Sequence, residues 1–211
     1  MNTKDKIIKN AAKLFAKQGF QKTTIKQIAR DANVNIAAIN YHFGSKYALI
    51  EKVVEQIYTP INNERIKKLN IIKVNNKQKD ISLVKGILRA FIEPPFTAEF
   101  ADKDTRFLLA LSYQIFLERD KKIITYFMLQ FKKPLCMFFQ LLSEALPYIP
   151  KNILSWRVHF TIGVAINAMK ILILPFPIPE MAPMPIANID ELIDQIIEFS
   201  YAGIISTTNK I

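Results

Sequence analysis

The chain has 211 residues, with 29 Lys and Arg against 18 Asp and Glu, and a formal net charge of +11. Half of its residues are hydrophobic and only 5 are Gly, which favours one or two well-packed helical domains over a disordered chain. One Cys and two His exclude an internal disulfide framework and a Cys/His zinc cluster, so we expect no cofactor. The first residues contain no apolar run typical of a secretory signal, which predicts a cytoplasmic protein.

The N-terminal residues predict one helix and its end. Apolar residues recur there at helical spacing, and Gly19 stands where the helix should stop. The apolar face consists of Ile7, Ala11, Leu14, Phe15 and Phe20. This helix should therefore pack against whatever follows it.

Residues 24–46 predict two further helices joined by a tight turn. Thr24 and Gln27 have the spacing of a capping box at the start of the first of them. Asn33 follows that helix, where the turn needs left-handed backbone that Asn tolerates. The core face of this helix contains Ile25, Ile28, Ala29 and Ala32. The second helix, at about 35–41, is anchored by Ile39, and the pattern is typical of a helix-turn-helix that places this helix in the DNA major groove.

The second helix of this pair carries the side chains predicted to contact bases. Ala37 and Ala38 are small enough to allow close approach to a base edge, and Asn35 and Asn40 can form hydrogen bonds with it. Phosphate contacts are expected from residues that lie at a helix N-terminus or beside the helix that enters the groove, namely Thr23, Thr24, Tyr41, His42 and Lys46. Two alternatives stay open, since Thr24 could serve only as a cap and Tyr41 only in packing.

Positive charge is concentrated in the same part of the chain. Residues 1–48 carry nine Lys or Arg and two Asp, a net charge of +7, and the other 163 residues carry the remaining +4. Such a field attracts phosphate, and it predicts double-stranded DNA as a partner and an affinity that falls steeply with salt. A merely solvated lysine-rich surface would explain part of the lysines but not their clustering.

The run Ala38-Ile39-Asn40-Tyr41-His42-Phe43-Gly44-Ser45-Lys46 resembles the DNA-binding domain of TetR-family transcriptional regulators, and the resemblance extends from about Asp5 to Leu49. It implies a homodimeric repressor on a palindromic operator, with a three-helix DNA-binding domain over 1–48 and a helical ligand-binding and dimerisation domain over 49–211. One departure is Tyr47-Ala48, where the family usually has an acidic residue, and this puts the usual start of the fourth helix in doubt.

The rest of the chain predicts an all-α protein of about nine helices. Further helices are expected over residues 45–69, with a kink at Pro60, and over 81–93, 101–118, 120–146, 152–174 and 188–206. Residues 70–79 are expected to form a loop, and Pro94-Pro95 a hard stop. Pro134 lies inside 120–146, so that helix either bends there or is two helices.

Residues 158–179 are nearly all apolar and could be misread as a membrane span. Asn167 and Lys170 would be costly in lipid, and the prolines from Pro175 onward end the helix early. We therefore expect no membrane span. The proline-rich stretch 175–185 is either a stiff arm that covers a partner or pocket, or a connection packed on its own protein.

The last two helices have long apolar faces that predict a homodimer through a four-helix bundle. The residues expected at this interface are Ile162, Ile166, Met169, Leu192, Ile196 and Phe199.

The C-terminal part is also similar to the PsrA-like subgroup, in residues 144–150 and 154–163. This resemblance implies a long-chain acyl effector, such as a fatty acid or an acyl-CoA. Candidate ligand contacts are Arg106, Phe107, Phe131, Arg157 and His159. For each of them core packing or an ordinary ion pair is the alternative.

No catalytic constellation is present in the sequence: it has no nucleophile elbow, phosphate-binding glycine loop, HExxH pair or dinucleotide fingerprint, which predicts that the protein is not an enzyme. Cys136 lies beside Met137 and Phe138 and is expected to be buried rather than a redox sensor. The alternative from another functional class is a soluble lipid-binding or interaction protein in which the helix-turn-helix is only a scaffold.

Overall fold

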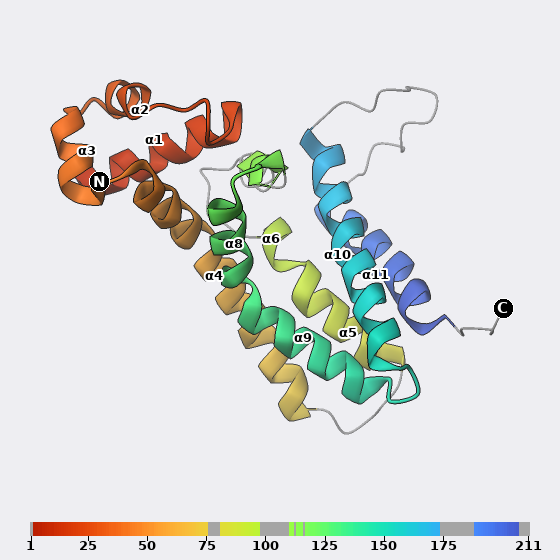
Figure 1. Cartoon of the computed structure of the whole chain (residues 1–211). Helices are drawn as coiled ribbons and strands as arrows, with labels where there is room; N and C mark the ends of the chain where they lie inside the picture. Colours follow the sequence, from red (N-terminus) through yellow and green to blue (C-terminus); the bar gives the residue numbers. More distant parts are fainter. Residues whose placement is uncertain are drawn as a thin grey trace, which may run out of the picture. The chain divides into compact units, whose positions relative to one another are not determined.

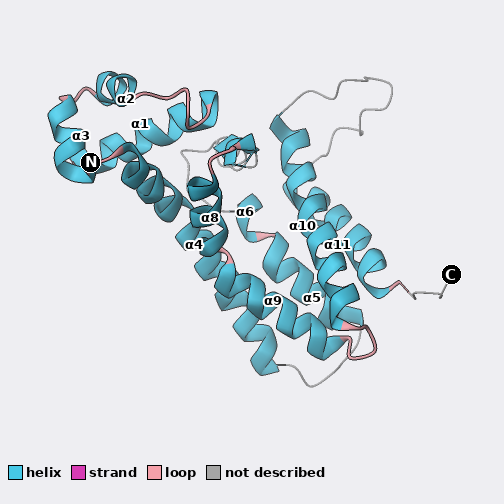
Figure 2. Ribbon diagram, in the orientation of Figure 1, coloured by secondary structure: helices cyan, strands magenta, loops and turns pink. Residues whose placement is uncertain are grey.

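The computed structural model describes residues 2–75, 81–97, 110–111, 113–115, 117–173 and 188–206. Every regular element in these ranges is a helix, so the predicted all-α class is confirmed (Figure 1, Figure 2). Contacts divide the chain into two compact units, residues 1–60 with 99–131 and residues 61–98 with 132–211. The predicted functional division between residues 48 and 49 stays a prediction.

Three short helices form the N-terminal head of the first unit. They are α1 (Thr3–Gln18), α2 (Ile25–Ala32) and α3 (Ile36–Phe43), and α1 packs against both of the others. Their shared core is made of apolar side chains with almost no exposed surface, namely Ile7, Phe15, Phe20, Ile28 and Ile39. The rings of Phe15 and Phe20 lie 4.9 Å apart, which closes the core where α1 ends.

The predicted end signals of these helices are confirmed. The Thr24 hydroxyl accepts a hydrogen bond from the Gln27 amide, while the Gln27 side chain accepts one from the Thr24 amide, which completes the capping box. Asn33 has left-handed backbone with φ 52°, and Gly19 ends α1 with φ 83°. α3 begins one residue later than predicted, because Asn35 is its N-cap.

Helix α4 (Lys46–Asn75) leaves the head and runs through Pro60 into the second unit. The Ser45 hydroxyl accepts a hydrogen bond from the Ala48 amide at 3.1 Å, so α4 has its own start signal despite the missing acidic residue. The predicted loop over 70–79 is wrong for residues 70–75. No Gly or Pro interrupts that stretch, and a polar composition alone does not end a helix.

The first unit is completed by α8 (Lys121–Gln130), which begins at the N-cap Asp120. The Phe127 and Phe131 rings lie 5.0 and 5.6 Å from the Tyr58 ring of α4, so an aromatic cluster holds α8 against that helix. The predicted helix 101–118 lies mostly outside the described residues. Of those that are described, residues 110–111, 113–115 and 117 are helical and Glu118 is not.

The predicted helix 120–146 is two helices that meet at Phe131. Phe131 ends α8, and α9 (Lys132–Ala145) begins at the next residue. Pro134 therefore lies in the first turn of α9, where its missing amide hydrogen bond costs nothing. This break and the short helix after Ile92 each add one helix to the nine expected from the sequence.

The second unit packs the remaining helices around one core. Besides α9 and the end of α4 it contains α5 (Ile81–Ile92), α6 (Pro94–Thr97), α10 (Lys151–Ile173) and α11 (Ile189–Ile205). α5 packs against α9 and α11, and α10 packs against α9 and α11. Pro94 ends α5 as predicted and starts α6, a position that suits the fixed φ of proline. The core includes Ile87, Leu88, Phe138, Leu142, Leu154 and Ile193.

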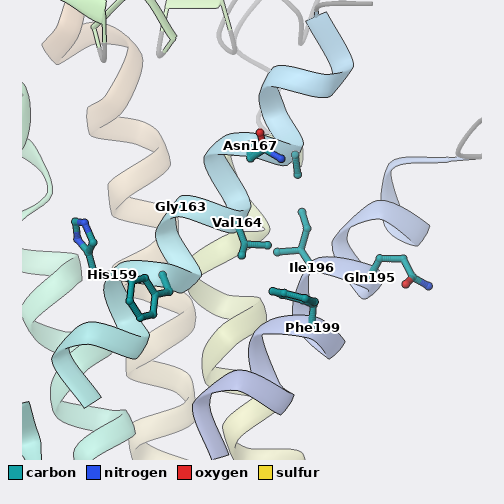
Figure 3. A pocket seen from close by; sticks show the side chains of 9 residues that line it. His159, Gly163, Val164, Asn167, Gln195, Ile196 and Phe199 are labelled. Carbon is teal, nitrogen blue, oxygen red and sulfur yellow. The ribbon is translucent and has the colours of Figure 1, made fainter. Parts of the chain in front are cut away.

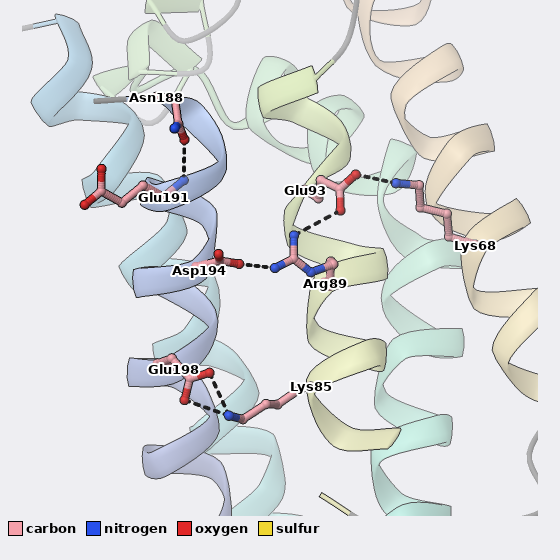
Figure 4. A network of polar contacts seen from close by, with 8 residues as sticks. All are labelled: Lys68, Lys85, Arg89, Glu93, Asn188, Glu191, Asp194 and Glu198. Carbon is pink, nitrogen blue, oxygen red and sulfur yellow. Dashed lines mark hydrogen bonds and ion pairs between the residues drawn. The ribbon is translucent and has the colours of Figure 1, made fainter. Parts of the chain in front are cut away.

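Ion pairs cross the exposed side of this core and join α4, α5 and α11 (Figure 4). Glu93 accepts from Lys68 of α4 at 2.6 Å and pairs with Arg89 at 3.7 Å, and Arg89 also donates to Asp194 of α11. Lys85 donates to Glu198 one turn further along. Such partly exposed pairs each contribute little to stability.

Two sequence predictions concern the apolar segments of the second unit. In the described ranges, which include all of α10, no helix combines the length and apolar character needed to cross a membrane. Cys136 was expected to be buried, and this expectation is wrong, because its side chain is on the exposed face of α9. Its apolar sequence neighbours point to other sides of the helix.

Candidate nucleic-acid interface

Helix α3 presents the predicted base-contacting residues on its solvent face. Asn35, Ala37 and Asn40 are exposed and Ala38 is half-buried, whereas Ile39 and Phe43 anchor the helix in the head core. Tyr41 keeps 86% of its surface exposed, which leaves its hydroxyl free of the core. The structure thus brings these residues together on a short helix that has one buried and one open side.

Asn35 combines capping with exposure. Its side-chain oxygen accepts a hydrogen bond from the Ala37 amide at 2.9 Å, which satisfies one orphan amide of α3. The side-chain NH2 group remains directed away from this bond, and it can only donate. Asn35 can therefore donate a hydrogen bond to an acceptor on a base edge while it caps the start of α3.

The predicted phosphate contacts fall into two groups. Tyr41 and His42 are exposed, with ring centroids 5.3 Å apart, and Thr24 is exposed at the start of α2. Thr23, in contrast, is fully buried, and its hydroxyl donates to the Gly19 carbonyl at 2.8 Å. The prediction that the Thr23 side chain contacts phosphate is corrected on this ground, because the hydroxyl is used inside the turn between α1 and α2.

Lys46 lies beside the same turn, at the start of α4. Its ammonium group donates to the Gln21 carbonyl at 3.3 Å. Partial burial lowers the pKa of Lys46, and the nearby Glu118 carboxylate opposes that effect. A phosphate group placed here would meet a cation that is already oriented, so little side-chain entropy would be lost on binding.

The structure does not gather the candidate ligand contacts into one site. Arg106 and Phe107 lie outside the described residues, and Phe131 belongs to the aromatic cluster of the first unit. Arg157 donates to the Ile204 carbonyl at 2.7 Å, near the end of α11. His159 is exposed on α10. A ligand role for these residues stays a prediction, and Arg157 already has a structural role.

An open apolar groove of about 750 Å³ runs between α10 and α11, and Figure 3 shows side chains of both helices around it. Its lining residues are His159, Phe160, Gly163, Val164, Asn167, Ala168, Gln195, Ile196 and Phe199. Phe160 is 61% exposed and Phe199 is 69% exposed, so large aromatic rings face solvent here. A contiguous apolar surface of this kind is typical of a protein interface.

The predicted interface residues are distributed over both sides of these helices. Ile196 and Phe199 line the groove. Met169 and Leu192 are buried within the chain, and Ile162 and Ile166 are half-buried. Sequence reasoning did not find Trp156 and Phe160, which stack at 6.0 Å on the exposed face of α10. Their spacing with Gly163 and Asn167 by four, three and four residues was the available signal.

Two family models match the chain. The model "Bacterial regulatory proteins, tetR family" matches residues 7–53, which include α1 to α3. The model "Tetracyclin repressor-like, C-terminal domain" matches residues 89–203, more than half of the chain. The family consists of transcription regulators.

Curated relatives match over the N-terminal part. The Staphylococcus aureus protein "Biofilm operon icaADBC HTH-type negative transcriptional regulator IcaR" is 36% identical over 80 residues, which are 38% of this chain and 39% of the relative. The Bacillus subtilis protein "Probable HTH-type transcriptional regulator YttP" is 45% identical over 58 residues, 28% of each chain. The match therefore spans less than two-fifths of the length of these relatives.

Solved structures share the fold over almost the whole chain. The fatty acid degradation regulator FadR from Bacillus halodurans superposes with a TM-score of 0.69 at 14% identity, covering 98% of both chains. A TetR-like transcriptional regulator from Rhodococcus sp. RHA1 superposes with a TM-score of 0.65 at 13% identity, covering 97% of both chains. The PsrA-like subgroup is not among these matches and stays a prediction. With an exposed reader helix, a basic head and both family models in place, the chain belongs to the TetR family of helix-turn-helix transcription regulators.

Proposed function

We propose that this regulator is a ligand-responsive repressor that binds a palindromic operator as a homodimer. The observation that carries the proposal is α3, whose open face combines exposed amides and small side chains on a head with a net charge of +7. Each subunit inserts α3 into one of two successive major grooves, about 34 Å apart. Asn35, Ala37, Ala38 and Asn40 meet base edges, and the following residues meet phosphates: Thr24, Tyr41, His42 and Lys46.

The second subunit covers the groove between α10 and α11. Trp156 and Phe160 on α10 and Phe199 on α11 keep more than half of their surface exposed. An isologous four-helix arrangement would remove these rings from water on both subunits at once.

A long-chain acyl compound is the proposed effector. The support is the fold shared with a fatty acid degradation regulator and the apolar composition of the C-terminal helices. An effector that binds one state of α4 more tightly would change the separation of the two α3 helices, and by linkage DNA would change the affinity for the effector equally.

The test is fluorescence anisotropy of the purified protein on DNA from beside its own gene, first with a salt titration and then with a series of acyl compounds. We expect specific binding that weakens steeply with salt and is altered by one acyl chain length. Lys46→Ala should weaken binding at least several-fold, whereas Lys73→Ala, an equal charge change on an exposed position of α4, serves as the control.

The outcomes separate the parts of the proposal. Specific binding that no acyl compound changes would keep the repressor and discard the acyl effector. Weak binding with no sequence preference would contradict the repressor and favour a lipid-binding protein with a scaffold helix-turn-helix.

A further inference from the structure

The solvent face of α3 carries no formal charge. The helix sequence Ile36–Phe43 contains no Lys, Arg, Asp or Glu, although residues 1–48 hold nine cations elsewhere. The commonest specific contact in the major groove is a bidentate Arg or Lys on guanine. This contact is not available from α3, and with Tyr41 and His42 assigned to phosphates in the proposed function, amide and apolar groups remain for the bases.

Ile36 is the apolar group in position to make such a contact. Among the described residues 2–45, large hydrophobic side chains are exposed at two positions, Ile36 and Tyr41, and both are on α3. Ile36 is the first residue of the helix and 42% exposed. A single exposed Ile needs no explanation on an ordinary surface, but the apolar group that a major groove offers is the C5-methyl of thymine.

Asn40 follows Ile36 by one helical turn and therefore lies on the same side of α3. It is exposed, and its amide can donate to N7 and accept from N6 of adenine at the same time. Asn35 differs, since its side-chain oxygen already accepts from the Ala37 amide and only its NH2 group can face a base. An amide and a methyl-binding side chain one turn apart match neighbouring A·T pairs.

We propose that α3 reads A·T base pairs, with Ile36 packed on the C5-methyl of a thymine and Asn40 bonded to the edge of an adenine. The inference rests on the proposed function, because it requires α3 in the major groove. The cations outside α3 then supply phosphate contacts and affinity, and the neutral helix supplies the choice of sequence.

The first experiment selects binding sites for the full-length protein from a randomised duplex library and sequences them. We expect a palindrome whose half-sites have A·T pairs where α3 docks. Thymines of the selected duplex are then replaced one at a time by deoxyuridine, which differs only by the methyl group. One position in each half-site should lose affinity about fourfold, the value expected for one buried methyl.

Two variants assign that methyl to its partner. In Ile36→Ala the deoxyuridine substitution should cost nothing further, because the apolar contact is already gone. Ile71→Ala is the matched control, since Ile71 is 52% exposed on α4 and lies outside the head. This variant should keep the full fourfold effect, and both variants should keep the helical content of the parent.

The inference is overturned if deoxyuridine is neutral at every position, if Ile36→Ala keeps the full deoxyuridine effect, or if the α3 positions are selected as G·C. The deoxyuridine series with the unchanged protein decides the matter even where Ile36→Ala is unstable. Failure to enrich any sequence would contradict the proposed function itself, and it is a different result from enrichment of a G·C site.

Discussion

Asn35 has two separable tasks at the level of single atoms, capping α3 through its oxygen and facing DNA through its NH2 group. Asn35→Ser keeps a good N-cap but withdraws the NH2 group, so thermal stability should change little while DNA affinity falls about threefold to tenfold. Asn35→Ala should lose both, with about 1 kcal/mol of stability. Differential scanning calorimetry and anisotropy on the selected duplex make the comparison. Unchanged DNA affinity in Asn35→Ser would restrict this residue to capping.

Single side chains were predicted unevenly from the sequence. Thr24, Gln27 and Asn33 were identified because capping and left-handed backbone depend on residues a few positions apart. Thr23 was assigned to DNA because the sequence does not reveal that the turn after Gly19 folds over its hydroxyl. Burial of such a polar group depends on contacts that close only in the folded head.

Within the first unit, the start of α4 contacts the start of α8. The Tyr47 hydroxyl at the start of α4 donates to Asp120, the N-cap of α8, and Gln21 donates to the neighbouring Glu118 at 2.8 Å. The hydrogen bond from Tyr47 is the main cause that lowers the pKa of Asp120, and it likewise raises the pKa of Tyr47. These contacts tie the segment before α8 to the DNA-binding head.

The lowered pKa of Asp120 and the raised pKa of Tyr47 determine the pH range in which this contact stabilises the fold. Asp120 with a lowered pKa stabilises the fold above about pH 3.9 and loses its contribution as the pH falls through the lowered value. Tyr47 with a raised pKa stabilises it below about pH 10 and loses its contribution as the pH rises through the raised value.

Tyr47→Phe should therefore raise the pKa of Asp120 toward its ordinary value, because the hydroxyl donor is removed. NMR titration of the Asp120 carboxyl group measures this shift. Tyr126→Phe is the control, since burial is the main cause of the raised pKa of Tyr126 and Asp120 is not among its causes. An Asp120 pKa that stays low in Tyr47→Phe would transfer the cause to the Lys122 amide.

Most helices could be predicted as elements, but not all of their ends. Periodic apolar residues and caps identified α10 and α11 to within a residue or two. The extension of α4 to Asn75 was missed because no Gly or Pro marks its end, whereas the division of 120–146 into two helices was one of the two alternatives that Pro134 left open. Those ends depend on packing, such as that of Phe131 on Tyr58.

At the scale of the whole molecule, Gly163 and the aromatic pair beside it carry the dimer prediction. Among the described residues, a Cβ at Gly163 would meet nothing within 4 Å, so Gly163→Leu should leave the single subunit folded. If a second subunit covers the groove, both Gly163→Leu and Phe160→Asp should convert the dimer to a monomer in analytical ultracentrifugation. Gly203→Leu is the control, because its Cβ also meets open space but it does not line the groove.

A dimer that survives both substitutions would mean that the second subunit binds elsewhere. The half-buried Ile166 is a further site, and Ile166→Asp should also dissociate the dimer.

The apolar faces of α10 and α11 could be predicted from the sequence. The side of α10 that faces its own core could not be predicted, because apolar residues occur on both sides of that helix and periodicity alone does not distinguish a core from an interface.

The uncharged surface of α3 has a consequence for how occupancy and target choice would evolve. In the proposed complex, the lysines around α3 set how long the protein stays on any stretch of DNA, and α3 sets where it prefers to stay. Gain or loss of surface lysines would then raise or lower residence on the whole chromosome without redirecting the regulator to other genes. Redirection would require a change within the eight residues of α3 or at its cap.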